Sequence, residues 1–501
     1  MSSVEKDANR RSAVSTAVVM ACTLFSRILG FVRTATIGAL FGAGGMADVI
    51  NLVFNIPNNL RKLLAEGALS AAFIPELSRE LTLEDSGKSA HKLARLILGL
   101  QALVILPFLA LCLIFPSRML GIFEQFSDPH KKALSVVFFR WMMPYLFFVS
   151  VSAVMMAVHN THDRFFIPAI TPIVFSISVI SSLFVGHLLH KEALFIGIGV
   201  LAGGLAQILV QYPSYRKLGY RLLPVIDFQN PSFRRVLIRW APMLVTSSLF
   251  AVNNQIAMLL ASYLPDKSAS ALTYAVVFYQ LPFGIFSASI TTVLYPRMSR
   301  QAAEKNFEGL LGSLAFGYRN LWALLLPSAM GLILLGEPII SMAFQRRAFT
   351  AFDTRLTATV LTAYAAGMPF VGLFNITQRA FYAVGDVKRP FYCALFTVIL
   401  DIGLSLSFVF GTDWGPSSLA WANSITFTAG GLIQFVILKR RMGFYQSRQT
   451  LVSFAKSAAG TAAGAVLIAA VFSITGRDWW LNGSYLGGFL LIIAIVLAAA
   501  A

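Results

Sequence analysis

Residues 25–77 read FSRILGFVRTATIGALFGAGGMADVINLVFNIPNNLRKLLAEGALSAAFIPEL, and they contain two apolar segments that are long enough to cross a lipid bilayer. The same segments carry six charged side chains: Arg27, Arg33, Asp48, Arg61, Lys62 and Glu66. An ionised side chain at membrane depth costs at least ~2–3 kcal/mol, so it normally faces a partner or a water-filled cavity. The stretch therefore predicts a polar cavity within a helical membrane protein, and several arginines in one cavity indicate an anion site.

The composition of the whole chain supports this class of protein. Of its 501 residues, 57% are hydrophobic and 12% are charged, whereas a soluble protein carries about 25% charged residues. Apolar runs recur along the chain, and we count about fourteen that are long enough to cross a bilayer. The last two of these runs are residues 452–474 and 481–501. We therefore expect an all-α polytopic membrane protein.

The distribution of charge predicts the orientation of the chain in the membrane. The formal net charge is +18, and basic residues gather in every second connection between the apolar runs. The largest clusters are Arg79 to Arg95, Arg216 to Arg235, Arg297 to Lys305 and Lys439 to Arg448. This bias is the positive-inside pattern, which places the N-terminus in the cytoplasm and explains the net charge without a nucleic-acid partner.

Motifs for other kinds of chemistry are absent from the sequence. The three cysteines, Cys22, Cys112 and Cys393, lie in apolar segments without paired spacing, so neither a disulfide framework nor a metal site is expected. There is no Walker A loop and no HExxH motif, so we expect a protein that is not an enzyme and holds no cofactor. The polar N-terminus MSSVEKDANRRSAVS favours a retained first helix over a signal peptide, because no small-residue cleavage site follows the first apolar run.

An internal repeat is visible in the sequence. FIPELSRE, from Phe73, returns as LYPRMSRQ, from Leu294, with the shared prolines 221 residues apart. HNTHDRFFIPAI, from His159, returns as YAVGDVKRPFYC, from Tyr382, with the prolines 222 residues apart. Two matches in the same order at nearly one offset predict two structurally equivalent halves.

The two halves predict how the chain is organised. Each contains an even number of the expected spans, so both start on the same side of the membrane. Such repeats are related by a pseudo-two-fold axis along the membrane normal, with a substrate site between them near mid-membrane. The expected domains are an N-terminal lobe of six helices at residues 1–217, a C-terminal lobe of six helices at 218–441, and two additional helices at 442–501.

The arginines of the opening stretch suit a phosphate-containing ligand. A guanidinium group matches phosphate oxygens in a bidentate manner, and a pyrophosphate offers several such edges. Arg27 and Arg33 are six residues apart and are not strictly on one helix face, but Gly30 between them allows a bend. Asp48 and Glu66 are expected to hold the arginines in place while the anion is absent.

Alternatives remain open for several of these polar residues. The charges can form an internal salt-bridge network, and Lys62 can extend to the membrane surface. Ser26, next to Arg27, can hydrogen-bond a substrate or bond back to its own helix. Asp401 lies in the eleventh apolar run and Asn254 in the seventh, where oxygen donors can bind Na⁺ or take up a proton and so couple transport to an ion gradient.

Five segments carry a resemblance to a known family: FSRILGFVR, FGAGGMAD, NIPNNLRKLLAEGALSAAFIPEL, FQRRAFTAFDT and RAFYAVGDVKRP. They resemble the MurJ (MviN) family of lipid II flippases, within the multidrug/oligosaccharidyl-lipid/polysaccharide (MOP) exporter superfamily. The resemblance implies a bacterial inner-membrane protein with fourteen helices in two lobes. Such a protein moves lipid II, the undecaprenyl-pyrophosphate-linked peptidoglycan precursor, from the cytoplasmic to the periplasmic leaflet by alternating access.

The resemblance also implies which residues bind the substrate. By motif match, the cavity residues of the family fall on Ser26, Arg27, Arg33, Asp48, Arg61 and Glu66. Many members have an arginine in the eighth span, where this chain has Val277, so the anion site is expected to rest mainly on the N-terminal lobe. The acid that some members use for sodium in the seventh span is also missing. The last two helices are expected to form a groove for the lipid tail.

Other expectations concern partners and alternative functions. We expect a monomer, with cell-wall synthesis proteins as candidate partners. A cation-coupled exporter of drugs, or of another lipid-linked oligosaccharide, is an alternative from the same superfamily. A drug cation favours acidic or aromatic walls, which the arginine-rich first segment does not provide. A non-transporting membrane scaffold explains the hydrophobicity but neither the repeat nor the buried charges.

Overall fold

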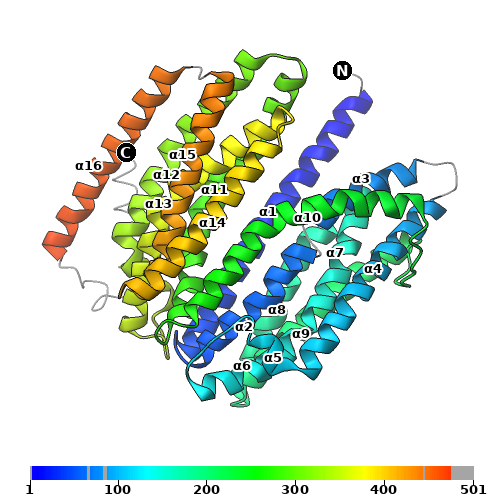
Figure 1. Ribbon diagram of the computed structural model, residues 1–501, viewed down its shortest axis with the longest axis horizontal. Helices are drawn as coiled ribbons and strands as arrows, with labels where there is room; N and C mark the ends of the chain where they lie inside the picture. Colours follow the sequence, from blue (N-terminus) through cyan, green and yellow to red (C-terminus); the bar gives the residue numbers. More distant parts are fainter. Residues whose placement is uncertain (1–2, 65–67, 83–86, 444–445, 476–501) are drawn as a thin grey trace. The chain divides into compact units, whose positions relative to one another are not determined.

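The structure, a computed structural model, describes residues 3–64, 68–82, 87–443 and 446–475. Within these ranges the chain forms sixteen α-helices and no β-strand (Figure 1), which confirms the predicted all-α class. Eleven segments of the described residues are long and apolar enough to cross a membrane. The protein is therefore a polytopic helical membrane protein. The last predicted span, residues 481–501, lies outside the described residues.

The chain divides into two compact units. The first contains Met1–Ile37 and Val49–Leu259, and the second contains Gly38–Asp48 and Leu260–Ala501. The end of α1, the loop after it and the start of α2 therefore belong to the second unit.

The helices of the first unit are α1 (Ser3–Phe41), α2 (Met46–Leu64), α3 (Ala68–Leu81), α4 (Lys88–Ile114), α5 (Pro116–Leu120), α6 (Pro129–Met142), α7 (Tyr145–Thr161), α8 (Phe166–Leu188), α9 (Glu192–Lys217) and α10 (Pro231–Ala261). Those of the second unit are α11 (Ser268–Ala303), α12 (Phe307–Phe344), α13 (Ala351–Ala383), α14 (Lys388–Gly411), α15 (Ser417–Met442) and α16 (Ser447–Thr475). The second apolar segment of the opening stretch thus contains two helices, α2 and α3.

The apolar pattern of α2 explains how this helix enters the core of the first unit. Val49, Leu52, Val53 and Ile56 follow the i, i+3, i+4, i+7 spacing of one helix face, and all four are fully buried. Arg61 falls outside this apolar set. The helix can therefore bury one face and still present a charged side chain elsewhere.

Small residues bring α8 and α9 together in the first unit. A Cβ atom on Gly199 of α9 would lie 2.7 Å from Cβ of Ser182 on α8, which is closer than non-bonded carbon atoms approach. The Ser182 hydroxyl donates to the carbonyl oxygen of Phe195 at 2.6 Å. The glycine-rich segment GIGVLAGG, from Gly197, therefore serves close helix packing.

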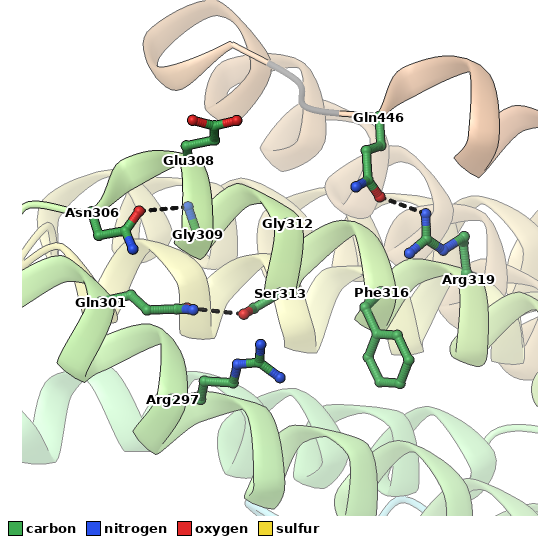
Figure 2. A pocket seen from close by; sticks show the side chains of 10 residues that line it. All are labelled: Arg297, Gln301, Asn306, Glu308, Gly309, Gly312, Ser313, Phe316, Arg319 and Gln446. Carbon is green, nitrogen blue, oxygen red and sulfur yellow. Dashed lines mark hydrogen bonds between the residues drawn. The ribbon is translucent and has the colours of Figure 1, made fainter.

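The second unit is built around α13, which packs against α11, α12 and α15. Helix α16 packs along α12, where Leu335 and Ile468 belong to one buried apolar cluster. The rings of Trp322 and Phe454 also meet edge to face, with centroids 5.1 Å apart. A polar pocket lies at the end of α11 and the start of α12 (Figure 2).

Candidate functional site

The side chain of Arg33, on α1, lies between aromatic rings in the first unit. Its guanidinium carbon is 5.8 Å from the ring centroid of Phe54 and 5.3 Å from that of Phe175. These two rings stack at 5.9 Å, and the ring of Tyr145 lies 5.1 Å from Phe175. A guanidinium over aromatic faces at such distances is stabilised by cation–π attraction. We call Phe54, Tyr145 and Phe175 the aromatic enclosure.

Three helices supply the aromatic enclosure and a fourth makes room for it. Phe54 lies on α2, Tyr145 begins α7 and Phe175 lies on α8. On α9, a Cβ atom at Gly203 would lie 2.8 Å from the Phe175 ring, and one at Gly204 would lie 2.9 Å from the Tyr145 ring. A larger residue at either glycine would therefore displace a ring that holds Arg33.

Arg61 places a second positive charge near Arg33, and the two guanidinium groups are close enough to repel each other. Arg61 lies on α2 seven residues after Phe54, so the two side chains leave nearly the same face of the helix. Its Nη2 atom donates to Oδ1 of Asn58 at 3.0 Å. The arrangement favours an anionic ligand, because an anion relieves the repulsion and accepts hydrogen bonds from both groups.

Helix α10 supports α2 beside this pair of arginines. Nδ2 of Asn59 donates to Oε1 of Gln255 at 3.1 Å. In the same polar run of α10, Asn253 is buried and Asn254 is exposed. The run therefore contacts the helix that carries Arg61 through Gln255.

The other predicted residues of the opening stretch are placed differently. On α1, Ser26 is half-buried and Arg27 is exposed. Arg27 precedes Arg33 by six residues, which corresponds to about 9 Å along the helix axis. The structure thus brings Arg33 and Arg61 together, whereas Glu66 lies outside the described residues.

Asp48 belongs to the second unit, where its carboxylate caps the start of α11. Its Oδ2 atom accepts from the backbone N–H of Lys267 at 2.9 Å, and Oδ1 accepts from that of Ser270 at 2.8 Å. The Tyr274 hydroxyl donates to the Gly42 carbonyl oxygen at 2.9 Å, which fastens the same loop. A carboxylate at a helix N-terminus stabilises N–H groups that lack a partner within the helix. A role of Asp48 in holding the arginines stays a prediction.

Asp401 and Asn254, the residues predicted to couple transport to an ion, belong to different units. Asp401, on α14, is buried and accepts from the Thr426 hydroxyl at 3.3 Å. It also interacts electrostatically with Tyr364. Among the described residues, no group of three or more His, Cys, Asp or Glu side chains is suited to hold a metal ion. The ion-coupling role stays a prediction.

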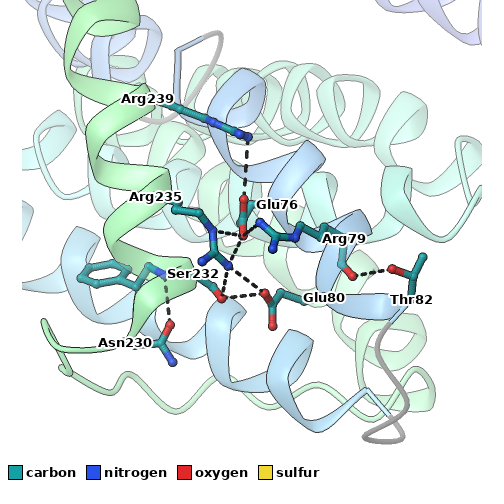
Figure 3. A network of polar contacts seen from close by, with 9 residues as sticks. Glu76, Arg79, Glu80, Thr82, Asn230, Ser232, Arg235 and Arg239 are labelled. Carbon is teal, nitrogen blue, oxygen red and sulfur yellow. Dashed lines mark hydrogen bonds and ion pairs between the residues drawn. The ribbon is translucent and has the colours of Figure 1, made fainter.

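A buried group of charges joins α3 to α10 in the first unit (Figure 3). Glu76 is 1% exposed, and its Oε1 atom accepts from Nε of Arg235 at 2.7 Å. Oε1 of Glu80 accepts from the Ser232 hydroxyl at 2.6 Å and lies 3.3 Å from Nη2 of Arg235. The hydrogen bond with Glu76 raises the pKa of Arg235. We call Glu76, Glu80, Ser232 and Arg235 the α3–α10 cluster.

The sequence analysis identifies neither the aromatic enclosure nor the α3–α10 cluster. A signal for the enclosure exists, because Phe54 and Arg61 share a helix face. For the cluster, the acids of FIPELSRE are visible in the sequence, but their partner Arg235 is more than 150 residues away along the chain. Such pairings depend on how the helices pack.

The fold identifies the class of protein. A solved structure described as an inward-facing multidrug resistance MATE family transporter of the MOP superfamily matches with a TM-score of 0.70. The match covers 85% of this chain and 98% of that one at 15% identity. The protein therefore has the fold of the MOP-superfamily transporters.

Comparisons at higher identity define the family. The profile of the lipid II flippase MurJ family matches residues 37–490. A "Probable lipid II flippase MurJ" of Borreliella burgdorferi is 35% identical, covering 85% of this chain and 83% of that protein. One of Thermotoga maritima is 32% identical, covering 88% and 87%. A solved structure, "Lipid II flippase MurJ, inward closed conformation", is 28% identical with a TM-score of 0.80 and covers 97% and 98% of the two chains.

This chain belongs to the lipid II flippase MurJ family, as the motifs of the opening stretch indicate. Members of this family are transporters, and the expectation of a protein that is not an enzyme is confirmed.

Proposed function

We propose that this protein flips lipid II from the cytoplasmic to the periplasmic leaflet by alternating access, and that Arg33 and Arg61 bind its pyrophosphate. The observation that carries the site assignment is the pair of neighbouring guanidinium groups, one of them held in the aromatic enclosure. Ser26, Arg27 and Glu66 are proposed to make further contacts to the headgroup.

The aromatic enclosure gives Arg33 a fixed orientation before any ligand arrives. A preorganised side chain loses less conformational entropy on binding, so more of the hydrogen-bond energy appears as affinity. The guanidinium fork then presents parallel N–H groups to the phosphate oxygens. Arg61 supplies a second fork for the same diphosphate.

The enclosure also bears on the alternative of a drug-cation exporter. Aromatic walls suited to a cation are present in the first unit, but the side chain of Arg33 occupies them. The cation–π site is therefore filled by the protein itself, which leaves an excess of positive charge for an anionic substrate.

We propose the remaining architecture on the same basis. Two six-helix lobes, at residues 1–217 and 218–441, are followed by two helices at 442–501 that hold the lipid tail, for about fourteen spans in all. The protein lies in the bacterial inner membrane as a monomer with its N-terminus in the cytoplasm, since the basic clusters follow the positive-inside pattern.

The direct test is to deplete the protein in its native host, supply variants, and measure which leaflet holds the labelled lipid precursor. Arg33→Ala and Arg61→Ala are each expected to leave the precursor in the cytoplasmic leaflet, while the amount of protein in the membrane stays normal. Arg33→Lys is expected to restore flipping only in part, because an ammonium group lacks the bidentate fork.

Arg118→Ala is a matched control, because Arg118 lies over the ring of Phe115 at 5.8 Å on α5 of the same unit. It removes the same kind of contact elsewhere and is expected to leave the precursor distribution unchanged. Normal flipping by both Arg33→Ala and Arg61→Ala would disprove the site. Single cysteines at positions 33 and 61 should react with a water-soluble thiol reagent in a transporter, whereas a scaffold needs no hydrated cavity there.

A further inference from the structure

Two adjoining polar cavities lie in the second unit, which does not contain Arg33 or Arg61. The first, of about 400 Å³, is lined by the end of α11, the start of α12 and Gln446 (Figure 2). The second, of about 760 Å³, is lined by Gln446 and the first turns of α16. Because Gln446 lines both, we treat them as one site and call it the α11–α16 pocket.

The lining of the α11–α16 pocket is rich in positive charge. Arg297 and Arg319 line the first cavity, and Arg448 and Lys456 line the second. Arg297, Arg448 and Lys456 make no hydrogen bond or ion pair within the part of the chain that the structure describes. All three are exposed, so their charges are available to a ligand.

The fourth cation and the acid nearby do not neutralise this charge. Nη1 of Arg319 donates to the neutral amide oxygens of Gln446 at 2.7 Å and Gln449 at 3.1 Å. Glu308 is the one carboxylate among the described lining residues, and its side chain points away from Arg297 (Figure 2). The pocket therefore has a net positive charge.

Hydrogen bonds hold the other polar side chains of the first cavity. The Ser313 hydroxyl donates to Oε1 of Gln301 at 2.9 Å, which ties α12 to α11. Oδ1 of Asn306 accepts from the backbone N–H of Gly309 at 2.8 Å and so caps α12 (Figure 2). The walls between the arginines are thus formed without a ligand.

The surroundings of the pocket are those of a membrane lipid. α11, α12 and the described part of α16 are all long and apolar enough to span a membrane, and the pocket lies at one end of each. Large apolar side chains beside it face outwards: Phe316 is 51% exposed and Leu451 is 68% exposed. A phosphate held in the pocket would have these surfaces next to it for acyl chains.

We propose that the α11–α16 pocket binds the phosphate headgroup of an anionic membrane phospholipid. Guanidinium groups form strong charge-assisted hydrogen bonds with phosphate oxygens. Basic pockets between the ends of transmembrane helices recognise such headgroups. A lipid bound there bridges α11 and α12 to α16, and so helps to hold α16 in place.

The test is to titrate the purified full chain with phosphatidylglycerol or phosphatidylcholine in detergent and to count bound lipids by native mass spectrometry. The unmodified protein is expected to bind phosphatidylglycerol in preference to phosphatidylcholine. The triple variant R297Q/R448Q/K456Q is expected to weaken phosphatidylglycerol binding by at least about tenfold, because three charges are removed. Millimolar inorganic phosphate is expected not to displace the lipid.

A second triple variant, R300Q/K305Q/K388Q, is the matched control. It removes the same charge from exposed positions of the same unit that do not line the pocket, and binding is expected to stay within about twofold. Equal weakening in both variants, or in neither, would overturn the proposal. Binding of inorganic phosphate in place of the lipid would overturn the lipid assignment.

Two further variants keep the result interpretable. R448Q alone removes one exposed charge at the start of α16, and roughly threefold weaker lipid binding is expected even if the triple variant does not fold. Arg33→Ala, in the other unit, is expected to bind phosphatidylglycerol normally. A failure of the proposed transport site and a failure of the lipid site would therefore be distinguishable.

Discussion

The two repeated segments, FIPELSRE on α3 and LYPRMSRQ on α11, end in opposite electrostatic environments. After the shared proline, the first segment has Glu76, which is buried against Arg235, and the second has Arg297, which lines the α11–α16 pocket. Four residues further on, Glu80 accepts from Ser232 at 2.6 Å, and Gln301 accepts from Ser313 at 2.9 Å. The second segment thus keeps the serine hydrogen bond and lacks both carboxylates.

This difference shows how one position can serve stability in one unit and binding in the other. In the first unit the acids neutralise an arginine from α10, and the charges are consumed in holding two helices together. In the second unit the arginine has no acid to neutralise it and faces a cavity. An exchange of charge at one position can therefore separate a structural contact from a candidate binding site.

The largest expected effect comes from breaking the α3–α10 cluster. Arg235→Ala leaves the carboxylate of Glu76 buried without its main partner, and we expect the free energy of unfolding to fall by about 2–3 kcal/mol. Thermal unfolding of the purified protein measures the loss. Arg234→Ala, at an exposed neighbouring position on the same helix, is the control and should change little. Equal melting temperatures for the two variants would contradict a structural role for the cluster.

An intermediate effect is expected from the cap that shapes the pocket. Asn306→Ala removes the side-chain acceptor for the Gly309 N–H at the start of α12. We expect a loss of about 1 kcal/mol, and Asn306→Asp should restore it because aspartate caps equally well. Thermal unfolding again provides the measurement. No difference between the alanine and aspartate variants would exclude a capping role.

A smaller effect, dependent on pH, is expected at the ion pair that joins α14 to α15. Asp386 pairs with Arg389 and Arg441; burial opposes ionisation, but the hydrogen bonds and charges of these arginines prevail and hold the pKa of Asp386 below its usual range. A carboxyl group with a lowered pKa stabilises the fold above its ordinary pKa, and this stability is lost as the pH falls through the folded-state value.

Asp386→Asn should therefore cost about 0.5–1 kcal/mol at neutral pH, since both arginines are largely exposed. The difference from the unmodified protein should vanish at acid pH. Unfolding curves recorded from pH 7 downwards test this, with Asp413→Asn at an exposed position as the control. A difference that stays constant with pH would rule out the ion pair as its cause.

The smallest effect on stability is expected where the second segment is made to resemble the first. Arg297→Glu places the acid of FIPELSRE at the equivalent position of the pocket, and the free energy of unfolding should change by less than about 0.5 kcal/mol because the site is exposed. Binding of phosphatidylglycerol should nevertheless fall. A large loss of stability would show that Arg297 is structural, as Glu76 is.

Much of the fold is predictable because the length of an apolar run is a local property. The runs that become α4, α8, α9 and α12 are visible in the sequence and span the membrane length in the structure. The division of the second apolar segment into α2 and α3 is less visible, since both parts are apolar. Arg33 and Arg61 are identifiable as site residues, because a charge in an apolar run demands a polar environment.

The sequence by itself determined that this is a helical membrane transporter of the lipid II flippase family and that its first helices carry an arginine site. Only the tertiary structure decided that Arg33 lies between Phe54 and Phe175. It also decided that Asp48 caps α11 and that Glu76 has a partner whereas Arg297 faces a pocket. The physical reason is that hydrophobicity and charge are properties of each segment, whereas a side chain's partners depend on helices that are distant in sequence and meet only when they pack.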